Sequence, residues 1–372
     1  MEYDETVYAC AINRIFNYNC RDARMLTDMV GTPGEIFAMS QRELQEMLKD
    51  NGHYSSAVHD SRILKAAAEE VRWARNGGIR IIYIRDKEYP KRLRECPDAP
   101  TVLFYKGNCS LNPSRSVAIV GTRKATAYGT AQCRKIIEAL ACLTDRPAII
   151  SGLAYGIDIT AHTCALDCGI PTIAVLPTGL DTIYPPQHRR HAVRICSNGA
   201  LVTDFPKDST PMAITFLRRN RIIAGMSDAV ILVESAAKGG GLITARTAIS
   251  YSREVFAIPG RIGDRYSEGC NRLIEANGAA LLTSPESFTS AMGWEDRRKE
   301  AADSLFQQLF EQSDYIQRNI LLTLLANSAV ERNSLIRECG ADPAQVLTRL
   351  TRMELDGIIG SDIYGRYILK VR

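Results

Sequence analysis

Three arginines lie within four positions of the segment "FLRRNRIIAGM": Arg218, Arg219 and Arg221, with Asn220 before the last of them. Guanidinium and amide groups donate several hydrogen bonds, and a guanidinium matches the geometry of phosphate or carboxylate oxygens. No aspartate or glutamate occurs in residues 209–227, so the nearby chain supplies no carboxylate to neutralise the cluster. The segment therefore predicts an anion-binding site. The alternatives are a solvated helix face and pairing with carboxylates that are distant in sequence.

Glycine and basic residues also follow the short apolar runs in the middle of the chain. These runs include "SVAIVG", "PAIISG", "DAVILVES" and "REVFAIPG". In an open parallel sheet, ligands bind at the carboxyl ends of the strands, where glycine lets backbone amides approach a phosphate. The residues of this kind are Gly121, Thr122, Arg123, Lys124, Lys238, Gly239, Gly240, Gly241 and Arg261. Since they are spread along one expected edge, they favour an extended polyanion such as a nucleic-acid backbone over a small nucleotide.

A groove for single-stranded nucleic acid also needs flat side chains on which bases stack. Phe216, Tyr184 and Tyr155 are candidates, and burial in the core is an equal alternative for each.

Other chemistry has weaker support. Ser151, Asp158 and His162 invite a catalytic triad, but no GxSxG motif is present, and Asp158 suits the cap of a following helix. His188 and His191 have metal-ligand spacing without further ligands. The chain has no GxxxxGK[ST] and no GxGxxG motif. We therefore expect no catalytic residues, no metal and no cofactor.

Composition is that of an ordinary globular protein of two or three domains, with 372 residues and a formal charge of +4. The eleven cysteines form no C-x-x-C pair, which suggests buried free thiols in a reducing compartment. No apolar run is long enough to span a bilayer. A cytoplasmic protein without a membrane partner is expected.

The periodicity of apolar residues changes along the chain. Residues 1–77 read as a helical domain, whose Gly-Pro turn suggests a helix-hairpin-helix-like or SAM-like module, with a plain packing hairpin as the alternative. Residues 78–290 alternate apolar strands with helices, which predicts an α/β domain with a doubly wound parallel sheet. Residues 291–303 read as a charged linker. Residues 304–372 predict a winged helix, with Asp342 capping a helix that starts at Pro343, followed by a hairpin.

The middle of the chain resembles the bacterial DprA/Smf family of DNA-processing proteins. The resemblance rests on "VAIVGTRKATAYG", "ISGLAYGIDITAH", "TIAVLPTGLDTIYP", "RNRIIAG", "ITARTA" and "VFAIPG", in the family's order. It implies an extended Rossmann-like domain in a non-enzymatic, dimeric protein. Such a protein binds single-stranded DNA, protects incoming strands in natural transformation and loads the recombinase RecA onto them.

The resemblance also implies roles for individual residues. Phosphate contacts fall on Gly121, Thr122, Arg123, Arg219, Asn220 and Arg221. Ser151, Gly152 and Gly156 line the pocket, and Phe216 packs on a base. Together with Arg218, Lys238 and Gly240, these residues make up the predicted DNA-binding site. The sequence departs from the family at Thr122 (usually Ser), Leu217 (Pro), Gly239 (Ser) and Pro177 (Gly), none of which removes a positive charge.

Two other functions fit parts of the sequence. A nucleotide-processing enzyme of the phosphoribohydrolase type shares the Rossmann-like build, but Ala245 stands where an acid is sought in "KGGGLITAR". A duplex-binding regulator would use the winged helix, whose second helix carries Arg349 and Arg352 but also Glu354 and Asp356.

Overall fold

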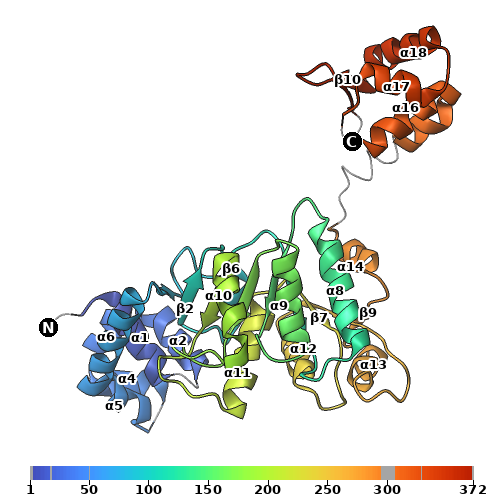
Figure 1. Ribbon diagram of the computed structural model, residues 1–372. Coiled ribbons are helices and arrows are strands. Elements are labelled where there is room, and N and C mark those ends of the chain that lie inside the picture. The colour runs from blue at the N-terminus through green and yellow to red at the C-terminus, as the bar shows by residue number, and fades with distance from the viewer. Residues whose placement is uncertain (1–2, 17–18, 50, 295–305, 328, 371–372) are drawn as a thin grey trace. The chain divides into compact units, whose positions relative to one another are not determined.

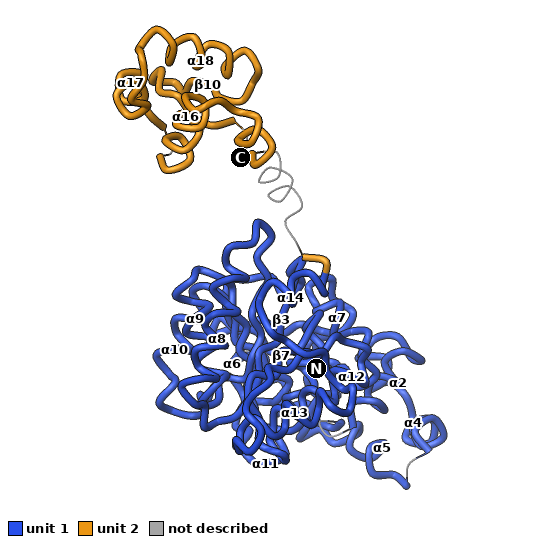
Figure 2. The backbone as a smooth tube through the Cα atoms, turned by 90° about the vertical axis from the view of Figure 1, so that its right-hand side faces the viewer, with its two compact units in different colours: residues 1–292 blue, residues 293–372 orange. Residues whose placement is uncertain are grey.

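The computed structural model describes residues 3–16, 19–49, 51–294, 306–327 and 329–370. The chain forms two compact units, residues 1–292 and residues 293–372 (Figure 2). Most of the linker expected at 291–303 lies outside the described residues. The N-terminal helical segment and the sheet thus belong to one compact unit, with the winged helix in the other.

Among its described residues, the first unit begins with six helices, followed by nine strands with further helices between most of them (Figure 1). The N-terminal helices are α1 (Glu5–Ile15), α2 (Cys20–Val30), α3 (Pro33–Ala38), α4 (Gln41–Leu48), α5 (His53–Val58) and α6 (Ser61–Asn76). The strands are β1 (Arg80–Tyr83), β2 (Val102–Gly107), β3 (Ser116–Val120), β4 (Ala148–Ser151), β5 (Thr172–Val175), β6 (Gly199–Thr203), β7 (Ala229–Leu232), β8 (Glu254–Ala257) and β9 (Ala280–Leu281). The helices between them are α7 (Lys91–Arg94), α8 (Ala127–Ala141), α9 (Ile157–Asp167), the short 3-10 helix η1 (Pro186–His188), α10 (Arg189–Ser197), α11 (Ala213–Gly225), α12 (Gly240–Ser250), α13 (Glu268–Glu275) and α14 (Pro285–Ala291).

The strand order is β1-β2-β6-β5-β4-β3-β7-β8-β9. Strands β6 to β9 in this order pair in parallel, as the sequence predicts, whereas β1 and β2 add an antiparallel edge beside β6. Central strand β3 pairs with both β4 and β7, so that Ala118 lies opposite Ile150 and Val230. All five residues of β3 are buried, because helices cover both faces of the sheet.

The chain runs outward from β3 in two directions, and this determines where a ligand can bind. Helices α8, α9 and α10 pack side by side on one face, and α11 packs against α12 on the other (Figure 1). Strand order therefore reverses between β3 and β7, which is the switch point where open α/β sheets bind ligands, outside the carboxyl ends of the strands.

The N-terminal helices pack on the antiparallel edge of the sheet. Ala67 and Val71 of α6 share one hydrophobic cluster with Val102 and Phe104 of β2. Helix α6 ends at Gly77, as the sequence predicts from its glycine pair. This shared core explains why the helical segment and the sheet form one unit.

The second unit has the predicted winged-helix build. Its elements are α16 (Tyr315–Ala326), α17 (Arg332–Cys339), α18 (Pro343–Leu355), β10 (Ile359–Ser361) and β11 (Tyr367–Leu369), the last two forming an antiparallel hairpin. The Asp342 side chain accepts a hydrogen bond from the backbone N–H of Gln345 and so caps α18, which confirms the predicted helix start. Val346, Leu350 and Met353 are buried in its core.

The eleven cysteines are all free thiols, and most of them are buried, as expected. Within the described ranges, the structure contains no helix whose length and apolar character would let it cross a membrane.

Candidate nucleic-acid interface

The loop after β3 is held between two neighbouring loops. The Thr122 N–H donates to the Glu234 carbonyl (2.8 Å), and the Thr122 carbonyl accepts from the Ile157 N–H (3.2 Å). Gly156 supports this loop from below with a φ of +75°, and a Cβ there would lie 2.2 Å from the Thr122 carbonyl oxygen. Gly121, Thr122 and Arg123 are therefore fixed in place at the carboxyl end of the central strand.

A cavity of about 550 Å³ lies beside this loop, at the ends of strands β3 to β7. Its lining includes Gly121, Thr122, Arg123, Asp158, Tyr184, Met212, Phe216, Leu217, Arg219, Asn220, Gly239, Gly240 and Gly241. The structure thus brings together the glycine loops after β3 and β7 and one face of α11, as the sequence predicts from their position at one sheet edge.

Arg219 is the most deeply placed cation of this cavity, with 3% of its surface exposed. Its Nη1 donates to the Val175 carbonyl (3.1 Å) and lies 4.0 Å from Oδ2 of Asp158. Within the described residues, its Nε has no hydrogen-bond partner. Burial lowers the pKa of Arg219 to about 10, so the guanidinium stays charged at neutral pH. The cavity therefore contains a charged donor that the protein satisfies only in part.

Gly152 makes room for this guanidinium. A Cβ at position 152 would lie 1.4 Å from Nη1 of Arg219, so any side chain there would displace the arginine. Gly152 therefore does not line the cavity, as the sequence predicts it would, but acts indirectly, because it leaves room for the Arg219 guanidinium.

Aromatic and apolar side chains form one wall of the cavity. The Cζ atom of Arg123 lies 4.6 Å from the ring centre of Phe216, and Tyr184 packs edge-on against Phe216 at 5.5 Å. Leu217 and Met212, two exposed apolar residues, continue this wall. The arrangement places a guanidinium and a ring face within reach of one nucleotide.

The arginine cluster is divided between two faces of α11. Phe216, Arg219 and Asn220 face the cavity, whereas Arg218 and Arg221 turn towards Cys20 of α2 and line a separate hollow. The sequence correctly predicts that Arg218 and Arg221 share a helix face, but that face does not meet the glycine loops.

Arg221 is neutralised by a carboxylate, so the expectation of a cluster without acidic partners is wrong for this residue. Its Nη2 donates to Oδ2 of Asp204, and its Nη1 donates to the Asp98 carbonyl. Burial alone would lower the pKa of Arg221, but the Asp204 carboxylate outweighs it and raises the pKa. Asp204 directly follows β6, 17 residues before Arg221 and outside the segment 209–227 that lacks acidic residues.

The remaining predicted residues, Ser151 and Lys238, lie outside the cavity lining. Ser151 is buried and donates to the Ile119 carbonyl (2.6 Å), and Lys238 is exposed next to the glycine loop.

His162 is buried, and both of its ring nitrogens have hydrogen-bond partners, the Thr172 hydroxyl (2.8 Å) and the Leu153 N–H (3.3 Å). Burial lowers the pKa of His162 to about 3. His162 is thus not available as a general base for a serine nucleophile.

His188 and His191 have the spacing of metal ligands, but they are not part of a cluster of potential ligands within the described residues. Nδ1 of His188 pairs with the Leu153 carbonyl at 2.7 Å. Asp158 lies in the first turn of α9, after the cap residue Gly156, and accepts from the Ala154 N–H rather than capping the helix as expected.

Glu234 is a site-forming residue that sequence reasoning missed. It is buried, and its carboxylate accepts hydrogen bonds from the backbone N–H (2.9 Å) and the hydroxyl of Thr126, at the start of α8. A Cβ at Gly129 would collide with this carboxylate, so the glycine is required there. The N-terminus of the helix after β3, which holds the phosphate in nucleotide-binding Rossmann folds, is therefore occupied by a protein carboxylate.

We expect Gly156→Ala to destabilise residues 1–292 and to weaken binding of an anionic ligand in the cavity. An alanine with φ of +75° costs about 1–3 kcal/mol, and the clash with the Thr122 carbonyl adds to it and shifts the loop. Urea denaturation and ligand titration would measure both effects. Gly169→Ala is the matched control, because φ there is +68° with open space around the added Cβ. Equal losses in the two variants would contradict the role of Gly156 as a support for the loop.

Comparisons with known proteins agree with this geometry. Residues 80–293 match the family described as DNA recombination-mediator protein A, and residues 311–361 match the DprA winged helix domain. Protein Smf of Escherichia coli is 36% identical over 309 residues, which cover 82% of this chain and 81% of that protein. DNA processing protein DprA of Streptococcus pneumoniae is 43% identical over 201 residues, or 54% of this chain and 70% of that protein.

Two solved structures resemble the chain at 31% identity. The X-ray structure of DNA processing protein A from Streptococcus pneumoniae superposes with a TM-score of 0.63 over 78% of this chain and 98% of that one. DNA processing protein A from Helicobacter pylori, reported for its single-stranded DNA binding mode, superposes with a TM-score of 0.52 over 57% of this chain and 95% of that one.

Proposed function

The chain belongs to the DNA recombination-mediator protein A family, whose members include proteins named DprA and Smf, and from this premise we propose that it binds single-stranded DNA in the cavity beside Arg219. The observation that carries the proposal is the buried, charged and partly unsatisfied guanidinium of Arg219, placed beside glycine loops and an aromatic wall. The Helicobacter pylori relative, reported for its binding of single-stranded DNA, supports it.

Phosphates would bind on the glycine side of the cavity. Backbone amides of the loop at Gly240 can approach the strand closely, because a Cβ there would meet only open space. The loop at Gly121 lines the same cavity. Arg219 and Arg123 neutralise the phosphates, and the release of counterions from the strand drives binding. Bases would lie against the ring of Phe216 and the apolar wall, where stacking contributes about 1–3 kcal/mol per base.

Selectivity for single strands would follow from the depth of Arg219. Only a backbone that bends into the cavity reaches a guanidinium with 3% exposure, and the phosphates of a duplex lie on a stiff cylinder. The duplex is thus expected to contact Arg123 at the rim without reaching Arg219.

The biological role proposed with this activity is that of the family, namely DNA processing during natural transformation and recombination. The protein would act as a homodimer that protects single strands and transfers them to the RecA recombinase. It would bind its partner DNA without chemical change, so no catalytic residues and no cofactor are proposed.

A nucleotide-processing enzyme has less support from the site. Its substrate phosphate would need the N-terminus of α8, which the buried Glu234 carboxylate occupies. Base release from nucleoside monophosphates, measured at high protein concentration, would favour the enzyme over the binding protein.

We expect Arg123→Ala to weaken binding of labelled oligo-dT and to flatten the dependence of log K on log salt by about 0.7, the value for one phosphate contact on a single strand. Fluorescence anisotropy at several salt concentrations measures both, with the matching duplex as a second probe. Arg42→Ala is the matched control, because Arg42 is an exposed arginine of α4 that pairs with Glu46 of its own helix. Equal affinity of the Arg123→Ala and Arg42→Ala variants would refute the proposed cavity.

A further inference from the structure

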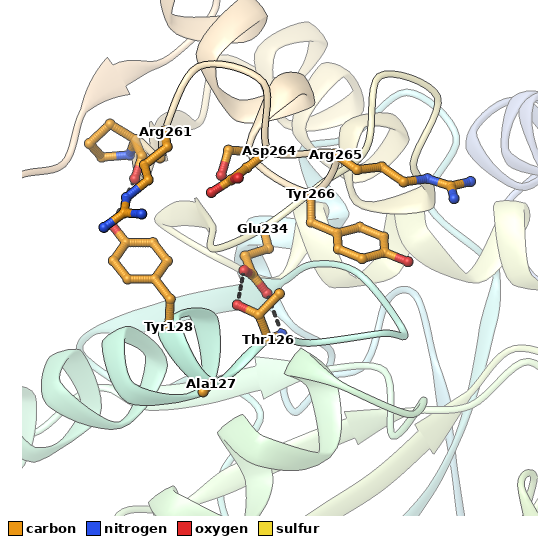
Figure 3. A pocket seen from close by; sticks show the side chains of 11 residues that line it. Thr126, Ala127, Tyr128, Glu234, Arg261, Asp264, Arg265 and Tyr266 are labelled. Atoms are coloured by element: carbon orange, nitrogen blue, oxygen red, sulfur yellow. Dashed lines mark hydrogen bonds between the residues drawn. The ribbon is translucent and has the colours of Figure 1, made fainter.

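A second cavity, of about 790 Å³, lies beside Glu234, at the start of α8 (Figure 3). Its walls are the start of α8, the end of β7 and the loop after β8. The lining residues are Thr126, Ala127, Tyr128, Glu234, Pro259, Gly260, Arg261, Asp264, Arg265, Tyr266 and Ser267. The proposed function uses none of these side chains.

Two arginines stand in the exposed loop at the rim of this cavity. Arg261 and Arg265 are both exposed, and Ile262 between them is 100% exposed, so the loop projects into solvent. In the nearby helix Arg272 pairs with Glu268, whereas neither loop arginine forms an ion pair within the described residues. The loop therefore presents two cations that are free to meet an external anion.

Two aromatic rings accompany these cations. Tyr128 is 44% exposed, and its hydroxyl donates to the Pro259 carbonyl (2.7 Å), which fixes the ring at the wall of the cavity. The Cζ atom of Arg265 lies 5.9 Å from the ring centre of Tyr266. Figure 3 shows Tyr128 beside Arg261 and Tyr266 across the cavity from it. Rings next to guanidinium groups are the side chains on which single-stranded bases stack.

Two carboxylates limit what can enter. Glu234 and Asp264 reach the cavity from opposite walls (Figure 3), and both of them would repel a phosphate placed inside it. A base is uncharged and can occupy the interior, while its phosphates stay at the rim with the arginines. The chemistry fits a nucleotide within a strand better than a free nucleotide, whose terminal phosphate carries more charge.

The two cavities are close neighbours. One wall, formed by residues 121–128 and 234–239, separates them, and the Thr122 N–H donates across this wall to the Glu234 carbonyl (2.8 Å). Arg123 lines the first cavity and Thr126 the second, and since only two residues separate them in the chain, their Cα atoms are at most about 11 Å apart. A strand that leaves the first cavity over this wall meets Arg261 and Arg265.

We propose that the second cavity is a further subsite for the same single-stranded DNA, with Arg261 and Arg265 on phosphates and a base between Tyr128 and Tyr266. The inference rests on the proposed function, because the first cavity must hold the strand. It lengthens the contact beyond the glycine loops, so only strands longer than the first cavity use it.

The test compares the affinity of the double variant Arg261→Ala/Arg265→Ala with that of the unchanged protein. The probes are oligo-dT strands of about 6 and about 20 nucleotides, a short and a long strand relative to the site sizes of single-strand grooves. The double variant should bind the short strand with unchanged affinity. It should bind the long strand about 2- to 30-fold more weakly, as expected for two exposed charge contacts. Its salt slope on the long strand should fall by about 1.4, that is, 0.7 for each of two phosphates.

Arg123→Ala tests the first cavity in the same experiment, and Arg42→Ala is the control for removing an exposed arginine. If Arg123→Ala weakens both lengths and the double variant weakens neither, the first cavity stands and the subsite is overturned. Equal weakening of both lengths by the double variant also overturns it, because the arginines would then act at the first cavity. If Arg123→Ala weakens neither length, the proposed function itself fails.

Discussion

Replacing Arg221 by alanine is expected to lower the free energy of unfolding of residues 1–292 by about 3–5 kcal/mol, while the folded variant keeps its affinity for single-stranded DNA. The reason is the burial of both partners: Arg221 is 8% exposed and Asp204 is 2% exposed. Removing the guanidinium leaves the Asp204 carboxylate and the Asp98 carbonyl without their donor, and an unpaired buried charge is costly. Urea denaturation of the full chain measures the loss.

A double variant separates the ion pair from simple packing. Arg221→Met/Asp204→Leu removes both charges and keeps similar volume, so it should cost less stability than Arg221→Ala alone. Oligo-dT titration without urea and at low temperature, where the variant is folded, then tests whether its affinity for single-stranded DNA is unchanged. A stable Arg221→Ala variant with weakened DNA binding would contradict this prediction and would support the DNA contact that the sequence predicts for Arg221.

The α/β domain could be predicted because its signals are local. Each buried strand is a run of β-branched residues that ends at a turn former, and the parallel pairing follows from the helices between the runs. The carboxyl ends of such strands must lie on one edge, which is why the loops at Gly121 and Gly240 meet at one cavity. The antiparallel strands β1 and β2 lack that signal, since β1 joins the sheet only through β2, and β2 pairs with β6, which lies far away in sequence.

The division of the arginine cluster could not be predicted, because it depends on contacts across the fold. A helix turns by a fixed angle per residue, so the sequence shows that Arg219 faces differently from Arg218 and Arg221. Which face meets the glycine loops depends on how α11 packs against α12, α7 and β5. Asp204 follows β6, Asp158 lies in the first turn of α9 and Glu234 follows β7, and each carboxylate becomes a partner only once the sheet has formed.

Arg219 should show the opposite behaviour to Arg221, with a large effect on binding and a smaller one on stability. Arg219→Gln is expected to weaken binding of oligo-dT by about 2–5 kcal/mol, which corresponds to roughly 30- to several-thousand-fold. A phosphate in the cavity pairs with a guanidinium that water reaches poorly, and losing a buried charge partner is costly for binding. Burial already raises the pKa of Asp158, its closest carboxylate, so that group can take up a proton when the cation is gone.

Gly152→Ala tests the same site without changing any charge. The added Cβ would lie 1.4 Å from Nη1 of Arg219, so the guanidinium must leave its place beside the Val175 carbonyl, and binding should fall as in Arg219→Gln. Gly169→Ala is the control, because position 169 is not part of the cavity lining and its added Cβ meets open space. If Gly152→Ala and Arg219→Gln bind oligo-dT as the unchanged protein does, the buried cation is structural, and the strand must bind elsewhere on the sheet edge.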